Sequence, residues 1–262
     1  SVKIARELGI PLTASFHCQA ENFSAHLFLM NAEHFNNDVY KFFYRKVYRY
    51  CAAVHYPTQF IRETFEEAVG AKTNAYVISN GVNKRFVRRP TEKPENFKDR
   101  YVILFTGRYS KEKSHRVLID AAAESKYADR IQLIFAGDGP LKEELEEYSR
   151  KKLKNQPLFR FFSREEMLDV LNYADLYVHP AEIEIEAISC LEAITCGLVP
   201  VIADSPRSAT RFFALGEDNL FRHGDPSSLA EKIDFWIEHP EEKDACRVKY
   251  LGYAKRFDQD AC

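Results

Sequence analysis

The chain has 262 residues, of which 45% are hydrophobic, and its formal net charge is -2. This length and composition predict a soluble protein with a packed core, and the near-neutral charge excludes a global basic field for nucleic acid. No apolar run reaches the roughly 20 residues of a membrane-spanning helix, so any membrane contact is expected to be peripheral.

The cysteines show neither C-x-x-C spacing nor a Cys/His metal pattern. This predicts scattered free thiols in a reducing, cytoplasmic compartment, and no bound metal. The six positions are Cys18, Cys51, Cys190, Cys196, Cys246 and Cys262.

Residues 1–84 predict a helix, three short strands and further helices. A doubly wound domain usually opens on a strand and has about 100–150 residues, whereas this chain opens on a helix. We therefore expect residues 1–84 to be the C-terminal portion of a Rossmann-like domain whose first βαβ unit is missing. Residues 85–100 are polar, contain Pro90 and Pro94, and predict a linker.

The segment 39–50 is predicted to be an amphipathic helix. Its expected apolar face consists of Val39, Phe42, Phe43, Val47 and Tyr50. Its basic face consists of Lys41, Arg45 and Arg49. Two interpretations remain open: a sheet-covering helix with a solvated basic face, or a helix that lies on an anionic membrane.

Residues 101–262 alternate short apolar runs with amphipathic stretches, which predicts a second, complete doubly wound domain with a parallel sheet. The expected strands occupy 101–107, 131–137, 159–162, 175–180 and 199–204. The expected helices occupy 114–126, 140–152, 164–173 and 187–196.

Two motifs follow strands of this sheet, at the edge where open α/β sheets bind ligands. Gly107-Arg108 ends the first strand and Lys113 follows at a helix start, an arrangement suited to phosphate. The alternative is a pair of solvated surface cations beside a tight turn.

The second motif is a pair of glutamates, Glu184 and Glu192, on either side of a helix start. Carboxylates can accept hydrogen bonds from vicinal sugar hydroxyls, while helix amides near Ala187 and Ile188 can face a diphosphate. Glutamates also favour helix starts through the macrodipole, but this does not explain Glu192, which lies within an apolar helix.

From residue 101 to about 258 the chain resembles the donor-binding domain of the retaining glycosyltransferases of family four. The likeness rests on GRYSKEK, IFAGDGP, DLYVHP and E-x7-E followed by LEAITCGLVPVIA. It implies the GT-B architecture of two Rossmann-like domains. It also implies that Arg108 and Lys113 hold the donor diphosphate, that Glu184 contacts the donor sugar, and that Glu192 contacts the ribose.

The sequence departs from this family at Glu186 and Ala187, where Phe and Gly are common. A tighter, more acidic sugar pocket is therefore expected. The first part of the chain resembles the family through PLTASFHCQAEN, HYPTQFIRETF and VISNGVN. In similar enzymes a histidine at the position of His17 contacts the transferred sugar, while a strand-end histidine held by backbone is the alternative.

The resemblance implies a retaining, metal-independent hexosyltransferase. It would take glucose from a nucleotide donor such as UDP-glucose, without a further cofactor, and pass it to a lipid-linked or saccharide acceptor. Two alternatives are a non-catalytic nucleotide-sugar-binding or membrane-docking module and a GT-B epimerase or phosphorylase. With half of one domain missing, the chain alone is expected to bind donor without transferring sugar.

Overall fold

The computed structural model describes residues 2–25, 27 and 29–260. The chain divides into two compact units. The first comprises residues 1–80 and 183–186, and the second comprises residues 81–182 and 187–262. Each unit has its own cluster of buried hydrophobic side chains.

The second unit is built on a six-stranded, fully parallel sheet with the order β6-β5-β4-β7-β8-β9. The strands are β4 (Tyr101–Thr106), β5 (Ile131–Ala136), β6 (Leu158–Arg160), β7 (Leu176–His179), β8 (Pro200–Asp204) and β9 (Leu220–Arg222). All six residues of β5 are buried, as expected of a strand covered on both faces. The strand order reverses beside β4, so ligand-binding loops are expected next to its carboxyl end.

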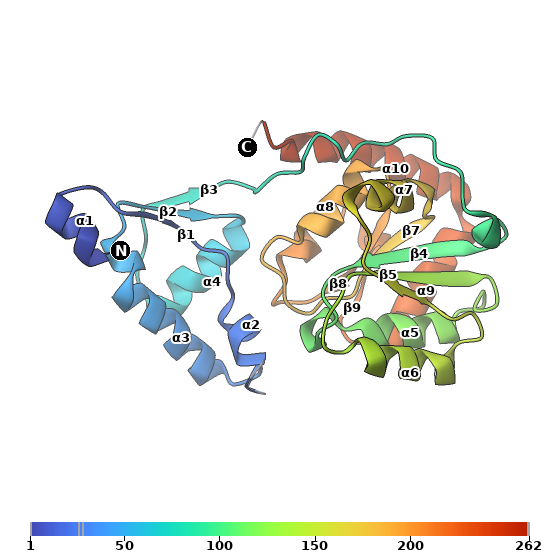
Figure 1. Cartoon of the computed structure of the whole chain (residues 1–262), viewed down its shortest axis with the longest axis horizontal. Helices are drawn as coiled ribbons and strands as arrows, with labels where there is room; N and C mark the ends of the chain where they lie inside the picture. Colours follow the sequence, from blue (N-terminus) through green and yellow to red (C-terminus); the bar gives the residue numbers. More distant parts are fainter. Residues whose placement is uncertain (1, 26, 28, 261–262) are drawn as a thin grey trace. The chain divides into compact units, whose positions relative to one another are not determined.

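Helices cover both faces of this sheet (Figure 1). One face carries α5 (His115–Glu124), α6 (Lys142–Lys152) and α9 (Pro226–Glu238), and the other carries α7 (Arg164–Tyr173), α8 (Ile188–Thr195) and α10 (Pro240–Ala254). Short 3-10 turns complete the unit: η2 (Glu95–Phe97), η3 (Lys111–Lys113), η4 (Ala209–Phe213), η5 (Glu217–Asn219) and η6 (Lys255–Phe257).

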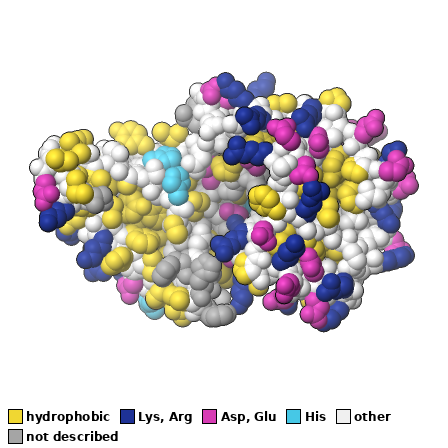
Figure 2. Space-filling view, in the orientation of Figure 1, with side chains coloured by type: hydrophobic (Ala, Val, Ile, Leu, Met, Phe, Trp, Pro, Cys, Tyr) yellow, Lys and Arg dark blue, Asp and Glu magenta, His cyan; other side chains and the backbone are white. Residues whose placement is uncertain are grey.

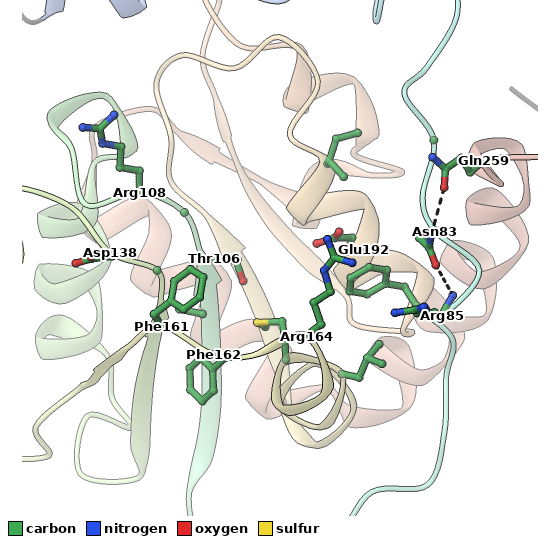
Figure 3. Close-up of a pocket in the computed structure, with 18 residues that line it drawn as sticks. Asn83, Arg85, Thr106, Arg108, Asp138, Phe161, Phe162, Arg164, Glu192 and Gln259 are labelled. Carbon is green, nitrogen blue, oxygen red and sulfur yellow. Dashed lines mark hydrogen bonds between the residues drawn. The ribbon is translucent and has the colours of Figure 1, made fainter.

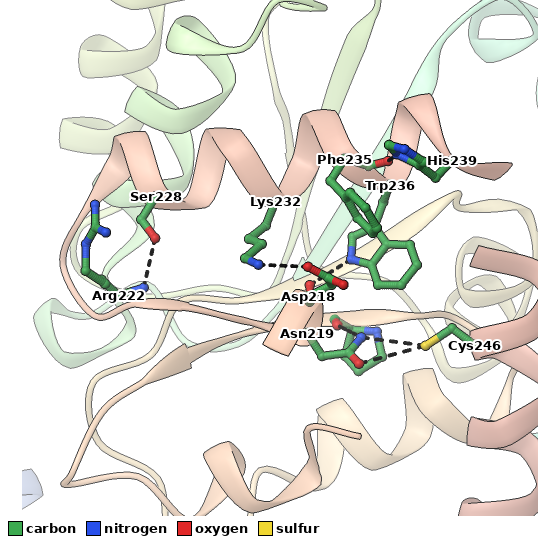
Figure 4. A network of polar contacts seen from close by, with 10 residues as sticks. Asp218, Asn219, Arg222, Ser228, Lys232, Phe235, Trp236, His239 and Cys246 are labelled. Carbon is green, nitrogen blue, oxygen red and sulfur yellow. Dashed lines mark hydrogen bonds and ion pairs between the residues drawn. The ribbon is translucent and has the colours of Figure 1, made fainter. Parts of the chain in front are cut away.

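Polar contacts fix α9 to η5, the turn that precedes β9 (Figure 4). Trp236 Nε1 donates to the backbone oxygen of Asp218 over 2.9 Å, and Lys232 Nζ contacts the Asp218 carboxylate at 2.9 Å. Asp225 caps the helix by accepting from Ser228 N, and Pro226 occupies its first turn. The single tryptophan is therefore held inside the second unit.

The first unit has a three-stranded parallel sheet with the order β1-β2-β3. Its elements are α1 (Val2–Leu8), β1 (Thr13–Ser15), α2 (Ala20–Ala25), α3 (Glu33–Lys46), η1 (Tyr48–Tyr50), β2 (Ala53–Tyr56), α4 (Gln59–Val69) and β3 (Ala75–Val77). Phe65 of α4 packs against Phe16, with ring centroids 4.5 Å apart, at the centre of an aromatic core.

The structure confirms the strands and helices expected in residues 101–204 to within two or three residues at each end. It adds β9, α9 and α10, which the sequence analysis did not identify. Thr58 caps α4 through Ile61 N, and Gly70 ends that helix in the left-handed conformation, with φ 68°. The segment expected to be a linker, 85–100, groups with the second unit, and Phe97 is buried in its core.

The prediction for 39–50 was wrong in two respects. The helix ends at Lys46, and residues 48–50 form a separate 3-10 turn. The buried face runs through Asn36 and Tyr40, with Tyr44 against the core, while Phe42 is 51% exposed. Tyrosine carries a large apolar ring, so it occupies core positions that a simple hydrophobic count assigns elsewhere.

None of the helices in the described part of the chain is long and apolar enough to cross a membrane. None of the five cysteines that the structure describes forms a disulfide bond.

Candidate functional site

A pocket of about 650 Å³ lies at the carboxyl edge of the second unit's sheet (Figure 3). It is lined by the ends of neighbouring strands, the loops that follow them, and the start of α8. The lining residues are Gly81, Asn83, Arg85, Phe86, Thr106, Gly107, Arg108, Ala136, Gly137, Asp138, Phe161, Phe162, Arg164, Met167, Leu168, Ile188, Glu192 and Gln259. The location agrees with the rule that open α/β sheets bind ligands where the strand order reverses.

The loops after β4 and β5 approach each other closely at this edge. A Cβ atom placed on Gly137 would lie 2.0 Å from the backbone oxygen of Gly107. Only glycine at position 137 allows this contact, since any side chain would push the two loops apart. Arg108 follows Gly107 directly, and its side chain is exposed at the pocket rim.

Lys113 follows in η3 and does not line the pocket. Its charge acts on the next helix, because burial and the nearby Lys113 ammonium lower the pKa of His115 to about 3. His115 is buried against Phe105 and Tyr109, so its imidazole is neutral at physiological pH. The two predicted phosphate ligands therefore differ in position: Arg108 lines the pocket, while Lys113 lies five residues further along the chain, in η3.

Glu192 projects from α8 into the pocket and is half-buried. Burial raises the pKa of its carboxyl group from 4.5 to about 7. This raised pKa singles out Glu192, because a desolvated carboxylate gains most from a ligand that donates hydrogen bonds to it.

Helix α8 begins at Ile188, which lines the pocket, and its N-cap is Ala187. Ala187 has φ 56° and ψ 63°, a left-handed conformation that costs a residue with a Cβ about 1 kcal/mol. Glycine is common here in the resembling family, and the structure shows why. Glycine adopts this conformation without that cost, whereas in this chain an alanine adopts it.

Glu184 and His17 belong to the first unit. Glu184 is half-buried in the segment 183–186. His17 is exposed beside His55, with ring centroids 5.4 Å apart, while the preceding Phe16 points into the core. His55 in turn contacts the backbone oxygen of Ile78 through Nε2 at 2.7 Å. Neither Glu184 nor His17 lines the pocket of the second unit.

Glu186 does not line the pocket either. Its carboxylate is 2% exposed and accepts hydrogen bonds from Ser79 Oγ and from Asn80 N and Nδ2. The acidic side chain at this departure from the family pattern thus has partners within the first unit.

The sequence analysis missed several residues that line the pocket. Asp138 lies within the quoted motif IFAGDGP, and Arg164 starts a predicted helix after a predicted strand, so both carried a signal. Arg85 and Gln259 carried none. Asn83 contacts both of them: its Oδ1 accepts from Arg85 N over 3.1 Å, and its Nδ2 donates to Gln259 Oε1 over 3.5 Å (Figure 3).

In the described part of the chain, no group of three or more His, Cys, Asp and Glu side chains is placed to hold a metal ion.

Comparisons with known proteins identify the family. Residues 87–250 match the family model described as Glycosyl transferases group 1, and residues 1–86 match Glycosyltransferase Family 4. The chain is 26% identical over 213 residues to the alpha-monoglucosyldiacylglycerol synthase of Streptococcus pneumoniae, covering 76% of this chain and 47% of that enzyme. The chain therefore spans about half the length of this relative.

Similar solved structures include the following two. The catalytic domain of cholesterol-alpha-glucosyltransferase from Helicobacter pylori is 43% identical, with a TM-score of 0.58, over 60% of this chain and 98% of that domain. Anabaena Alr3699/HepE in complex with UDP-glucose is 20% identical, with a TM-score of 0.82, over 99% of this chain and 71% of that one. This second likeness shows the GT-B fold. With its family model covering residues 87–250, the chain belongs to the glycosyl transferases group 1 family.

Proposed function

We propose that the protein transfers a hexose, with glucose as the first candidate, from a nucleotide sugar to a lipid-linked or saccharide acceptor with retention of configuration. The observation that carries the proposal is the pocket at the carboxyl edge of the second unit's sheet. There, Arg108, the start of α8 and Glu192 line one cavity. A cation, helix amides and a desolvated carboxylate match the diphosphate and ribose of a nucleotide sugar.

In this proposal Arg108 and Lys113 bind the diphosphate, together with Gly107 and the amides of Ala187 and Ile188. Glu192 accepts hydrogen bonds from the ribose, while Glu184 and His17 contact the donor sugar. Positive charge and helix amides would stabilise the departing diphosphate, which is the task of a cation in metal-dependent transferases. The reaction would then proceed without a metal.

The printed names of the relatives guide the choice of substrates. The S. pneumoniae enzyme is named for a glucosylated diacylglycerol, the H. pylori enzyme for cholesterol, and HepE was solved with UDP-glucose. UDP-glucose is therefore the donor to test first, with diacylglycerol and sterol acceptors.

The test is incubation with labelled UDP-glucose and each acceptor, with and without a chelator. Because the chain alone is expected to bind the donor without transferring sugar, a version extended at its N-terminus by a βαβ unit is assayed beside it. The expected product is an α-glucoside whose anomeric configuration, read by NMR, matches that of the donor. A β-linked product would contradict retention, and loss of turnover with the chelator would contradict metal independence. Formation of glucose 1-phosphate and UDP when inorganic phosphate replaces the acceptor would favour the phosphorylase alternative, and a changed sugar on the nucleotide would favour the epimerase.

We further propose that the protein works at the cytoplasmic face of a membrane, which it contacts through α3. Lys41 and Arg45 are exposed on this helix beside the exposed Phe42. Hydrophobic side chains cover much of the visible face of the first unit, whereas acidic and basic side chains intermingle over the second (Figure 2). Basic and apolar groups on one surface favour an anionic membrane.

A further inference from the structure

Glu186 is a buried carboxylate that the proposed chemistry does not use. Both of its oxygens accept from Asn80 N at 3.2 Å, Oε2 accepts from Asn80 Nδ2 at 2.6 Å, and Oε1 accepts from Ser79 Oγ. None of the ion pairs between described residues includes Glu186, although it is only 2% exposed. Hydrogen-bond donors therefore take the place of a counter-ion, and their loss would leave a buried charge uncompensated.

The neighbouring residue, Ile185, contacts the same unit through a hydrogen bond and through apolar packing. Thr58 Oγ1, which also caps α4, donates to the Ile185 backbone oxygen over 2.7 Å. The Ile185 side chain packs against the aromatic core that contains Phe16 and Phe65. The segment 183–186 thus has three independent attachments: the Glu186 carboxylate, the Ile185 carbonyl and the Ile185 side chain.

This attachment lies where the chain passes between the units. Asn80 is the last residue of the first unit before Gly81, and Glu186 is the last before Ala187. The hydrogen bonds between Asn80 and Glu186 tie these two exit points together. Directly after Glu186, Ala187 takes its left-handed conformation and α8 begins.

We propose that Glu186 is a positioning residue for the donor sugar: held by Ser79 and Asn80, it fixes the backbone of the segment that carries Glu184. The inference rests on the proposed function, in which Glu184 contacts the sugar. Arg108 and Glu192 line the second unit's pocket and do not depend on this attachment. Glu186 should therefore affect binding of the sugar and leave binding of the nucleoside diphosphate unchanged.

The test compares UDP with UDP-glucose by calorimetry for the wild type, Glu186→Gln, Asn80→Asp and the double variant. Glutamine has one acceptor oxygen, and its amide group would face the Asn80 amide. Glu186→Gln should weaken UDP-glucose binding about tenfold, as expected for a lost bond to a charged group, and change UDP binding less than about twofold. In the double variant, the introduced glutamine amide can donate to the introduced aspartate carboxylate, and the affinity for UDP-glucose should recover.

The matched control is Glu66→Gln. Glu66 is a buried carboxylate of the same unit, 3% exposed, and it accepts from Thr73 N and Oγ1 at 2.8 and 2.9 Å. It lies in α4, apart in sequence from the segment 183–186. An equal loss of UDP-glucose affinity in Glu66→Gln would attribute the effect to general destabilisation and overturn the proposal.

Hydrogen exchange of the amides at 183–186, which precede the α8 amides assigned to the diphosphate, gives a readout that does not depend on the donor. Exchange should be faster in Glu186→Gln than in the wild type and should be restored in the double variant. Unchanged exchange would overturn the positioning role even if a donor binds. A wild type that binds neither UDP nor UDP-glucose would instead count against the proposed function, while the exchange comparison still tests the attachment.

Discussion

Arg108 and Lys113 belong to one sequence motif, but only Arg108 lines the pocket. An exposed guanidinium at the rim can swing onto a diphosphate and bind it through two parallel hydrogen bonds. The lysine lies five residues further on, in a turn that leads into α5. The motif alone predicts that both residues bind the diphosphate, whereas the structure places only Arg108 in the lining of the pocket.

We expect Arg108→Ala to weaken UDP binding by about 1.5–3 kcal/mol, the usual contribution of a hydrogen bond to a charged group. Lys113→Ala should have a smaller effect. Calorimetry measures both, and Arg116→Ala serves as control because Arg116 pairs with Glu144 on α6 instead of lining the pocket. Equal affinities for the wild type and Arg108→Ala would contradict the phosphate assignment.

Glu192 should make the stability of the protein depend on pH. Burial raises its pKa from 4.5 to about 7, so the folded state binds this proton more tightly than the unfolded chain does. The resulting stabilisation is fully present below about pH 4.5 and is lost as the pH rises through 7. Its size is at most about 3 kcal/mol, because the half-buried side chain is partly screened by solvent.

Urea unfolding at pH 5 and pH 8 tests this expectation. Glu192→Gln cannot ionise, so the free energy of unfolding of its second unit, followed by the fluorescence of Trp236, should fall less between the two pH values than that of the wild type. If UDP binds through the ionised carboxylate, it should also release a proton near pH 7, which calorimetry in buffers of different ionisation enthalpy detects. Identical pH dependence in both proteins would mean that Glu192 is already ionised at pH 5.

At the scale of elements, buried strands were the easiest to predict. The strands β4 and β5 are continuous apolar runs because helices cover both faces of the sheet, and their bounds were found to within a residue. The strand β9 has only three residues, one of them exposed, so it gives no comparable pattern. The helix α3 was found, but its buried face was assigned to the wrong residues, because Tyr40 and not Phe42 fills the core.

The residues that line the pocket also fall into those that the sequence could predict and those that it could not. The residues that follow predicted strands, such as Arg108, or lie within a family motif, such as Glu192, could be identified from the sequence. Arg85 and Gln259 reach the pocket because the C-terminal segment pairs with residues 82–84, where Val82 N donates to the Phe257 oxygen. No local pattern reports a pairing between segments more than 170 residues apart.

The observed bounds of α3 decide which cations test the proposed membrane contact. Lys41 and Arg45 are exposed on the helix, whereas Arg49 lies beyond its end, with its guanidinium 4.5 Å from the Tyr50 ring centroid. We expect Lys41→Glu/Arg45→Glu to abolish sedimentation with phosphatidylserine-containing vesicles, since each basic residue contributes about 1 kcal/mol near an anionic surface. Arg150→Glu/Lys151→Glu on α6 changes the net charge equally and should still bind. Loss of binding in both variants would indicate a general charge effect.

At the scale of the whole molecule, the two units have very different cores. Among the described residues, the core cluster of the first unit has seven buried hydrophobic side chains beside a three-stranded sheet, whereas the second unit surrounds a six-stranded sheet with a much larger cluster. Because stability grows with the apolar surface removed from water, the first unit should unfold at a lower urea concentration than the second. The protein should then unfold in two steps, which a single midpoint cannot describe.

The single tryptophan makes this separation measurable. Trp236 is 4% exposed in the second unit and donates to the Asp218 backbone, so its fluorescence reports on that unit alone, whereas far-ultraviolet circular dichroism reports on helices of both. Circular dichroism should show a transition at low urea concentration that is absent from the fluorescence curve.

UDP at about 100 times its dissociation constant should stabilise the second unit by about 2.7 kcal/mol and move only the later transition. Coincident curves that move together on adding UDP would instead mean that the whole chain unfolds cooperatively, with nucleotide binding linked to the first unit as strongly as to the second.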